Sequence, residues 1–268
     1  MPAAEPRQNA DDLALISEAA HEAGRIALGF FKQSPEVWMK GGTSPVSEAD
    51  YAVDRFLRET LTAARPTYGW LSEETADSAG RLAATRTFVV DPIDGTRAFL
   101  DGRSTWCVSI AVVEGGHPLT GVLDCPATGE IFSASAGQGA SKDGRRLHVG
   151  PPREPALIGG PKPMLDAALP YLQRAIERAQ YVPSLAYRIA MVAEGSLDAT
   201  FIKPNAQDWD LAAADLILAE AGGQLLEPSG KRPVYATANP RHGVLAAGAG
   251  ALLAAMVEAL ATMTVGTA

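Results

Sequence analysis

Residues 88–96 read Phe-Val-Val-Asp-Pro-Ile-Asp-Gly-Thr, and this stretch decides how the rest of the chain is arranged. Phe88-Val89-Val90 is a short apolar run that predicts a buried strand. Because Pro92 has no backbone N–H to donate, we expect the strand to stop at Asp91. Asp94-Gly95 is typical of a turn. Two carboxylates three residues apart therefore lie where a buried strand leaves a sheet.

Two carboxylates at a buried position repel each other and lose favourable contact with water. A hard divalent cation removes that penalty, and Mg²⁺ is commonly held by one or two carboxylates together with phosphate oxygens of a substrate. The amides of Gly95 and Thr96 could open a helix and receive an anion beside the metal. The stretch therefore indicates phosphoryl chemistry, while its spacing alone is equally compatible with a simple Asx turn.

The composition fits a folded protein with a large core. The 268 residues are 47% hydrophobic, which is enough for one large domain or two fused halves. The 23 basic and 31 acidic residues give a net charge of −8 and form no basic run, which argues against nucleic acid as a partner. A net-acidic protein also repels phosphorylated substrates, so an anionic substrate would require a metal ion to reverse the local charge.

The chain before residue 150 predicts an α+β half. Residues 11–31 have the periodicity of an amphipathic helix. Residues 105–149 contain strand patterns joined by the hairpin signals Gly115-Gly116 and Asp143-Gly144. Consecutive hairpins predict an antiparallel sheet.

The chain after residue 150 has a different pattern. Five prolines between residues 151 and 163 interrupt it, and helical patterns at 164–180 and 184–194 are followed by alternating short strands and helices. Such alternation predicts a largely parallel sheet. We therefore expect an α+β half at 1–150 and an α/β half at 151–268, packed as one compact unit.

The sequence does not predict export or a membrane span. Residues 1–12 lack the charged and then apolar pattern of a signal peptide. The apolar stretch 244–263 is interrupted by Glu258 and predicts a strand and a packed helix. Cys107 and Cys125 lie in apolar strand patterns and are interpreted as reduced thiols, so we expect a cytoplasmic protein that does not bind membranes.

Three further acidic positions have two interpretations each. Asp50 comes three residues after Ser47, which is the spacing of a helix capping box. Glu73 follows a predicted strand, where glutamate side chains are usually solvated. Asp210 falls in the first turn of a predicted helix that Asp208 could cap, so that both acids would only favour the helix start. On these patterns alone, each acid is either structural or a ligand.

The motif Asp91-Pro92-Ile93-Asp94-Gly95-Thr96, with Phe99 after it, resembles the signature of the inositol monophosphatase superfamily. Three other segments resemble that superfamily in the same order, and they are Ser44-Pro45-Val46-Ser47-Glu48-Ala49-Asp50, Ser72-Glu73-Glu74 and Trp209-Asp210-Leu211-Ala212-Ala213. The resemblance implies Mg²⁺-dependent phosphomonoesterase activity and a layered αβαβα sandwich. It also implies inhibition by Li⁺ and association as a homodimer.

The resemblance also implies roles for individual residues. One Mg²⁺ would be held by Glu73, Asp91 and the carbonyl oxygen of Ile93, and a second by Asp91, Asp94 and Asp210, in a site of two or three ions. Catalysis would depend on Asp50, Thr96 and Glu73, with metal-activated water attacking the phosphorus in line. The substrate would contact Gly95, Thr96, Ser184, Lys203 and Asp210.

The substrate class is indicated most directly at position 203. Inositol-phosphate enzymes tend to carry a glutamate there that binds a sugar hydroxyl, whereas Lys203 suits a second anionic group. Residues 71–74 and 192–195 also resemble the CysQ-like 3'(2'),5'-bisphosphate nucleotidases. We therefore predict that the substrate is a small phosphorylated metabolite such as 3'-phosphoadenosine 5'-phosphate (PAP). The alternatives are inositol 1-phosphate, histidinol phosphate, and a regulatory role without catalysis.

Overall fold

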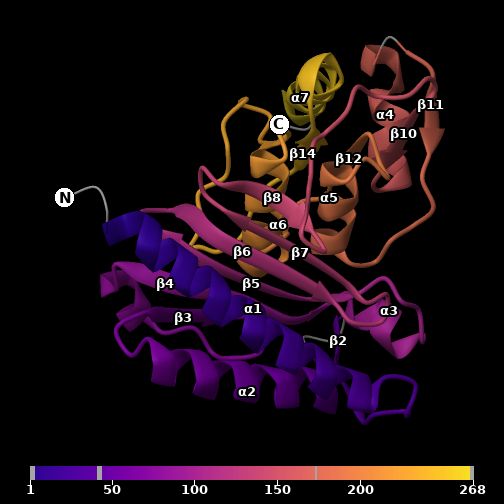
Figure 1. The fold of residues 1–268 in the computed structure, drawn as a ribbon. Helices are drawn as coiled ribbons and strands as arrows, with labels where there is room; N and C mark the ends of the chain where they lie inside the picture. The colour runs from indigo at the N-terminus through magenta and orange to yellow at the C-terminus, as the bar shows by residue number, and fades with distance from the viewer. Residues whose placement is uncertain (1–3, 41–43, 173, 266–268) are drawn as a thin grey trace.

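The computed structural model describes residues 4–40, 44–172 and 174–265, which stack as helix, sheet, helix, sheet and helix layers (Figure 1). The helices are α1 (Ala4–Phe30), α2 (Glu48–Ala64), the 3₁₀ turn η1 (Ala79–Ala83), α3 (Thr96–Leu100), α4 (Lys162–Leu172), α5 (Leu185–Ala193), α6 (Asp208–Glu220) and α7 (Gly250–Val265). This layering confirms the predicted αβαβα sandwich.

The first sheet has seven strands in the order β3-β4-β5-β6-β7-β8-β9. Its strands are β3 (Gly69–Ser72), β4 (Arg86–Asp94), β5 (Cys107–Glu114), β6 (His117–Cys125), β7 (Glu130–Ser135), β8 (Gly139–Lys142) and β9 (Arg145–Arg146). All neighbours are antiparallel except β3, which runs parallel to β4. A two-stranded hairpin of β1 (Val37–Lys40) and β2 (Ser44–Ser47) precedes α2.

Strand β4 does not stop at Asp91 as expected but runs on to Asp94. The pairing with β5 is regular up to Asp91, which is opposite Ser109, and then shifts before Asp94 pairs with Cys107. Pro92 falls inside that shift, where the ladder is already interrupted, so its missing N–H removes no ladder hydrogen bond. The irregularity leaves both carboxylates at the end of a buried strand.

The second sheet is mixed, with the order β11-β10-β12-β14-β13. Its strands are β10 (Ala156–Gly159), β11 (Ile176–Arg178), β12 (Ala199–Ile202), β13 (Gln224–Leu226) and β14 (Leu245–Gly248). The predicted parallel pairing holds for β11, β10 and β12, whereas β14 is antiparallel to both of its neighbours. The crossover from β12 through α6 to β13 leaves space for one strand between them, and β14 enters it in the opposite direction.

The helix predicted at 164–180 is wrong beyond Leu172. Pro170 already removes one backbone donor from α4, and β11 follows at Ile176–Arg178 as the edge strand beside β10. This segment therefore forms a short edge strand rather than the last turns of a longer helix. The helix predicted at 184–194 is confirmed as α5, with Ser184 as its N-cap.

Three hydrophobic clusters hold the layers together. One lies between the first sheet and the helices α1 and α2, and another joins the second sheet to α4 and α7. The largest fills the space between the sheets around α5 and α6, which cover the inner face of the first sheet (Figure 1). Helix α6 comes so close to β6 that a Cβ atom at Gly121 would lie 3.0 Å from Ala213 Cα. This packing brings the N-terminal ends of α5 and α6 to the end of β4.

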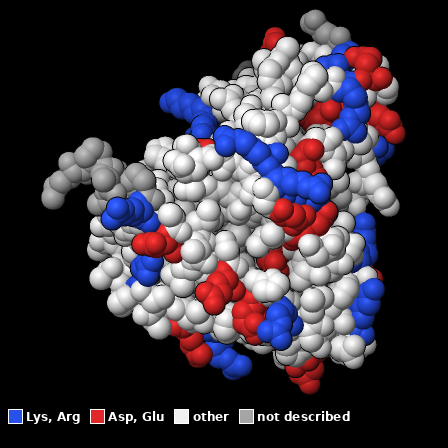
Figure 2. All heavy atoms as spheres, viewed as in Figure 1, with Lys and Arg blue, Asp and Glu red and all other residues white. Residues whose placement is uncertain are grey.

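The surface agrees with the charge pattern of the sequence. On the face shown in Figure 2, Lys and Arg side chains are interspersed with Asp and Glu and form no continuous basic band. Within residues 4–40, 44–172 and 174–265, the structure contains no helix with the length and apolar character needed to cross a membrane.

Candidate active site

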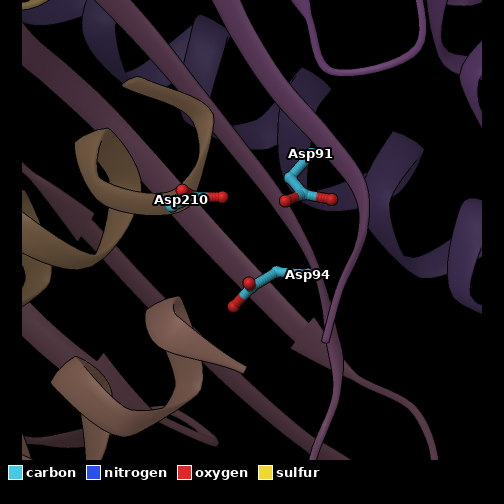
Figure 3. A group of neighbouring side chains, drawn as sticks. All are labelled: Asp91, Asp94 and Asp210. Atoms are coloured by element: carbon cyan, nitrogen blue, oxygen red, sulfur yellow. The ribbon is translucent and has the colours of Figure 1, made fainter. Parts of the chain in front are cut away.

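Three carboxylates meet between the two sheets. Asp91 and Asp94 come from the end of β4, and Asp210 comes from the first turn of α6. Their carboxylate oxygens lie within 4.8 Å of one another, and the three side chains face a common space (Figure 3). Asp91 is only 1% exposed and Asp94 only 5%. Three of the five residues that the sequence predicted as metal ligands, drawn from two separate motifs, are therefore brought together.

Burial and mutual repulsion make these acids difficult to ionise. Burial, followed by the charges of Glu73, Asp94 and Asp210, raises the pKa of Asp91 well above its ordinary value. Burial and then the charge of Asp94 raise the pKa of Asp210 to about 7. Burial also raises the pKa of Asp94, although hydrogen bonds from α5 oppose the rise. Such a cluster needs either protons or a cation to be stable.

Asp94 is fixed by the N-terminus of α5. Its carboxylate accepts hydrogen bonds from Ala186 N at 2.6 Å and Leu185 N at 3.2 Å, and from the hydroxyl of Ser184. Ser184 is fully buried and also accepts a hydrogen bond from Tyr187 N at 3.1 Å. The predicted substrate residue Ser184 thus lies behind Asp94, where it orients the carboxylate.

Gly95 and Thr96 form the turn after β4. Gly95 has φ +93°, and a Cβ there would lie 2.9–3.2 Å from atoms of Ser184, so this position requires glycine. The Thr96 hydroxyl lies 3.1 Å from the Ile93 carbonyl oxygen and 3.3 Å from Asp50 Oδ1, and its one proton can be donated to either of these acceptors. Ile93 is fully buried, so only its backbone carbonyl is available to the site.

Asp50 forms the capping box that its spacing predicts, and its two carboxylate oxygens have different partners. Its Oδ2 accepts hydrogen bonds from Ser47 N at 2.8 Å and from Ser47 Oγ at 2.6 Å, which forms the capping box of α2. Its other oxygen faces Thr96. Burial raises the pKa of Asp50, and the hydrogen bonds from Ser47 and Thr96 oppose that rise.

Glu73 directly follows β3 and lines the same cavity as the three aspartates. Its backbone N–H donates to Val90 O at 3.3 Å, which places it beside the end of β4. Its charge is the largest contribution to the pKa of Asp91 after burial. Glu73 is not a member of the trio within 4.8 Å, and it stands at the cavity wall facing Asp91.

The cavity has a volume of about 440 Å³. Seven of the predicted site residues line it, namely Glu73, Asp91, Asp94, Gly95, Thr96, Lys203 and Asp210. Arg188 of α5 also lines it; the resemblance implies substrate discrimination near residues 184–188, but Arg188 is not among the individually predicted site residues. Its one available signal was that it is the only charged residue in the otherwise apolar segment Leu185–Ala193.

Arg188 is a buried cation with incomplete partners. Its guanidinium donates to Val182 O at 3.3 Å and Phe201 O at 3.4 Å, while its Nε has no hydrogen-bond partner among the described residues. Burial lowers the pKa of Arg188, and the charge of Asp94 opposes this. Arg97, Arg188 and Lys203 are the three cationic residues that line this acidic cavity.

The helix cap at α6 differs from the expected one. Gln207 rather than Asp208 is the N-cap, and Gln207 N donates to Asp210 Oδ2 at 2.8 Å. Asp208 lies in the first turn instead, fully buried, and bonds to His242 and to Ala236 N. The aspartate that looked like a cap is therefore engaged with a distant segment.

Comparison with known proteins settles the family. The inositol monophosphatase family matches this chain over residues 9–263. The chain belongs to the inositol monophosphatase family. An inositol-1-monophosphatase of Rhizobium meliloti (strain 1021) is 34% identical over 230 residues, covering 81% of this chain and 86% of the relative. A histidinol-phosphatase of Mycobacterium tuberculosis is 35% identical over 237 residues, covering 82% of this chain and 88% of the relative.

Further family members extend the likeness. A 3'(2'),5'-bisphosphate nucleotidase CysQ of Aggregatibacter actinomycetemcomitans is 30% identical, covering 79% of this chain and 82% of the relative. The crystal structure of the extragenic suppressor protein suhB of Bartonella henselae superimposes with a TM-score of 0.82 at 29% identity, covering 93% of this chain and 98% of that one. The family consists of phosphatases, and this chain is a phosphoric monoester hydrolase of a small phosphorylated metabolite.

The site fits the Mg²⁺ dependence of this phosphatase family. Two buried carboxylates and one half-buried carboxylate, with raised pKa values and oxygens within 4.8 Å, present the hard oxygen ligands that Mg²⁺ prefers. A cation there would remove the repulsion that burial imposes on them. Mg²⁺ is accordingly the cofactor of this family member.

Proposed function

We propose that this inositol monophosphatase family member hydrolyses a 3'(2'),5'-bisphosphate nucleotide of the PAP type. The observation that carries this proposal is the set of three cations, Arg97, Arg188 and Lys203, on the wall of the cavity that also holds the acid cluster. Asp91, Asp94 and Asp210, with Glu73 and the Ile93 carbonyl, would hold Mg²⁺ at the acidic end. Bound Mg²⁺ supplies a Lewis acid that stabilises charge on the phosphoryl oxygens and the leaving oxygen.

The residues beside the proposed metal site would accept a proton from the attacking water and pass it on. The Thr96 hydroxyl lies between Asp50 Oδ1 and the Ile93 carbonyl oxygen. In this position Thr96 would accept a hydrogen bond from the attacking water and donate its own proton toward Asp50. The amides of Gly95 and Thr96, at the start of α3, would receive the phosphate in line with that water.

The second anionic group of the substrate would lie toward Lys203. The charge of Lys203 lowers the pKa of Asp210, against the effect of burial, so the ammonium group acts within the cavity. Arg188 lies deeper, and its unpartnered Nε leaves a buried donor to be satisfied. A substrate with two phosphate groups would use both the metal held by the acid cluster and the cationic side chains of the same cavity.

The cavity also continues beyond Arg188. A neighbouring cavity of about 370 Å³ shares Pro161, Tyr181 and Arg188 with the main one and is lined further by apolar side chains such as Leu165 and Val182. The exposed ring of Tyr181 stands at the junction. A substrate with a ring beyond its phosphates would use this space, which supports a nucleotide over a smaller substrate.

Inositol 1-phosphate is the second candidate. Its support is the 34% identity to the Rhizobium meliloti inositol-1-monophosphatase, which is greater than the 30% identity to the CysQ nucleotidase. Histidinol phosphate is supported in the same way by the Mycobacterium tuberculosis relative. A homodimer, a cytoplasmic location and inhibition by Li⁺ stay predictions.

The test is phosphate release from PAP, inositol 1-phosphate, histidinol phosphate and fructose 1,6-bisphosphate, each with Mg²⁺ and with EDTA. We expect PAP to be preferred at least about tenfold in kcat/KM, which is about 1.4 kcal/mol of transition-state discrimination, and EDTA to abolish activity. A preference for inositol 1-phosphate would overturn the nucleotidase proposal and leave the phosphatase assignment intact.

A further inference from the structure

We propose that Asp208 and His242 are positioning residues that hold the metal ligand Asp210 in place. The two residues form a buried pair between the start of α6 and the segment before β14. The inference rests on the proposed role of Asp210 as a metal ligand. Neither Asp208 nor His242 lines the cavity, so any effect on metal binding would pass through the chain that they fix.

Asp208 fastens two points of the distant segment at once. Its Oδ1 lies 2.7 Å from His242 Nε2, and its Oδ2 accepts a hydrogen bond from Ala236 N at 2.7 Å. The carboxylate is completely buried, and His242 is 9% exposed. The His242 ring also packs on Tyr235, with ring centroids 5.4 Å apart. A buried carboxylate with both oxygens bonded holds its neighbours firmly, because losing either partner would leave a buried charge unsatisfied.

The backbones of the two segments are joined next to this pair. Asp208 N donates to Pro240 O at 2.8 Å, and His242 N donates to Ala206 O at 2.9 Å. Asn205 N donates back to His242 O at 2.9 Å. Residues 205–208 are therefore bonded along their length to residues 240–242, and the side-chain pair closes one end of this connection.

The fastened turn is the one that carries the ligand. Asn205 and Ala206 line the cavity, and Asn205 has φ +74°, a left-handed conformation that needs support from its surroundings. Gln207 N donates to the carboxylate of Asp210 at 2.8 Å, and Asp210 N donates to Gln207 O at 3.1 Å. The orientation of the Asp210 carboxylate is thus set by the position of the turn.

The turn has to resist a repulsive force. Before a cation binds, Asp210 faces Asp94, whose charge raises the pKa of Asp210, and a looser turn would let the two carboxylates separate. Mutation of a residue that orients a metal ligand typically lowers the metal affinity by about 10- to 100-fold. We therefore expect the Asp208–His242 pair to contribute to Mg²⁺ affinity by keeping the ligand cluster assembled.

Asp215 offers a matched control on the same helix. It is 1% exposed and binds the same distant segment, accepting hydrogen bonds from the Tyr235 hydroxyl at 3.0 Å and from Arg232 at 3.1 Å. It lies well along α6, away from the turn at 205–208 and outside the cavity lining. Losing Asp215 removes a buried anchor of that segment without touching the ligand turn.

The experiment measures Mg²⁺ binding by titration calorimetry and amide hydrogen exchange of residues 205–211 in the full chain. We expect Asp208→Ala to weaken Mg²⁺ binding at least about tenfold and to speed exchange at these amides. Asp215→Ala should lower the melting temperature but keep the Mg²⁺ dissociation constant within about twofold. His242→Gln, which retains a side-chain N–H donor, should preserve most of the affinity. If Asp208→Ala does not fold, His242→Ala takes its place with the same expectation.

Wild-type Mg²⁺ affinity in a folded Asp208→Ala or His242→Ala variant would overturn the inference, as would an equal loss in Asp215→Ala. The wild type and Asp210→Asn separate this outcome from failure of the metal site itself. If Asp210→Asn binds Mg²⁺ as well as the wild type does, the proposed ligand role is wrong and the inference falls with it.

Discussion

The Thr96 hydroxyl stands 3.3 Å from Asp50 Oδ1, and this contact links the start of α3 to the capping box of α2. One oxygen of Asp50 is committed to Ser47, while the other faces Thr96. The carboxylate is thereby held in a fixed orientation, and it is not a member of the trio of clustered aspartates.

Replacing Thr96 by valine should remove the proton path while leaving the shape of the site unchanged. We expect Thr96→Val to lower kcat by about 10²–10⁴, the usual contribution of a positioned acid–base group, while the Mg²⁺ dissociation constant stays near the wild-type value. Stopped-time phosphate assays at saturating Mg²⁺ would measure this. Thr96→Ser, which keeps the hydroxyl, serves as the control, and wild-type turnover in the valine variant would contradict the assigned path.

Asp91→Asn should separate activity from stability. The variant should lose turnover because the central ligand is gone, and it should be more stable than the wild type in EDTA because a buried, repelled charge has been removed. We expect a gain on the order of 1 kcal/mol in the free energy of unfolding, read from thermal or denaturant unfolding at pH 7–8. Retained phosphatase activity would argue for a non-catalytic role of the acid cluster.

Mg²⁺ binding should depend on pH through Asp210, whose pKa is raised to about 7 by burial and by Asp94. Below that pH the carboxyl group is protonated in the metal-free protein, so binding must displace a proton. We expect tighter Mg²⁺ binding and less proton release at pH 8 than at pH 6. Calorimetry in buffers of different ionisation enthalpy would count the protons, and equal proton release at both pH values would contradict the assignment.

Asp124 should make stability fall as the pH rises. Its side chain is 7% exposed, its Oδ2 has no partner among the described residues, and burial raises its pKa from 3.8 to about 6, although His21 opposes this. The folded protein therefore holds this proton more tightly than the unfolded chain does, and its contribution is lost between about pH 4 and pH 6.

The variant that tests this is Asp124→Asn. It should match the wild type near pH 4 and exceed it above pH 6 by roughly 2–3 kcal/mol in the free energy of unfolding. Urea unfolding at both pH values would measure the difference. A constant difference between variant and wild type across this range would show that Asp124 does not titrate as described.

Lys203→Glu should shift substrate preference. Replacing the cation by an acid removes the partner of a second anionic group and places there the residue type that inositol-phosphate enzymes tend to carry. We expect kcat/KM for PAP to fall at least about tenfold relative to inositol 1-phosphate, at saturating Mg²⁺. Lys231→Glu changes the net charge equally at an exposed position outside the cavity, and should leave the ratio unchanged.

The local part of the site could be predicted from the sequence. Asp91, Asp94 and Gly95 are predicted from one short motif after an apolar run, and the structure places the two aspartates at the end of β4 and Gly95 directly after it. The partners of Asp208 could not be predicted, because His242 and Ala236 are far along the chain and no local pattern links them to a helix start. Arg188 was overlooked for a similar reason, since a lone basic residue on an apolar helix only gains meaning once the cavity beside it is known.

The fold shows the same division. Helix and strand periodicities predict the elements and the antiparallel first sheet, because hairpins pair neighbours in sequence. They do not predict that β14 enters between β12 and β13, since strand order depends on long-range packing. They also misassign β11, an edge strand of only three residues, Ile-Glu-Arg, which has too little apolar pattern to mark it as a strand.

The origin of the acid trio on β4 and α6 has a consequence for synthesis of the chain. Asp91 and Asp94 leave the ribosome long before Asp210, and the sheet that carries them has no complete cation site until α6 has packed on its inner face. A nascent chain that ends before α6 therefore lacks one of the three clustered carboxylates. A growing chain should therefore bind Mg²⁺ at this site only after α6 has packed against the first sheet. A truncated product that lacks α6 should bind Mg²⁺ weakly.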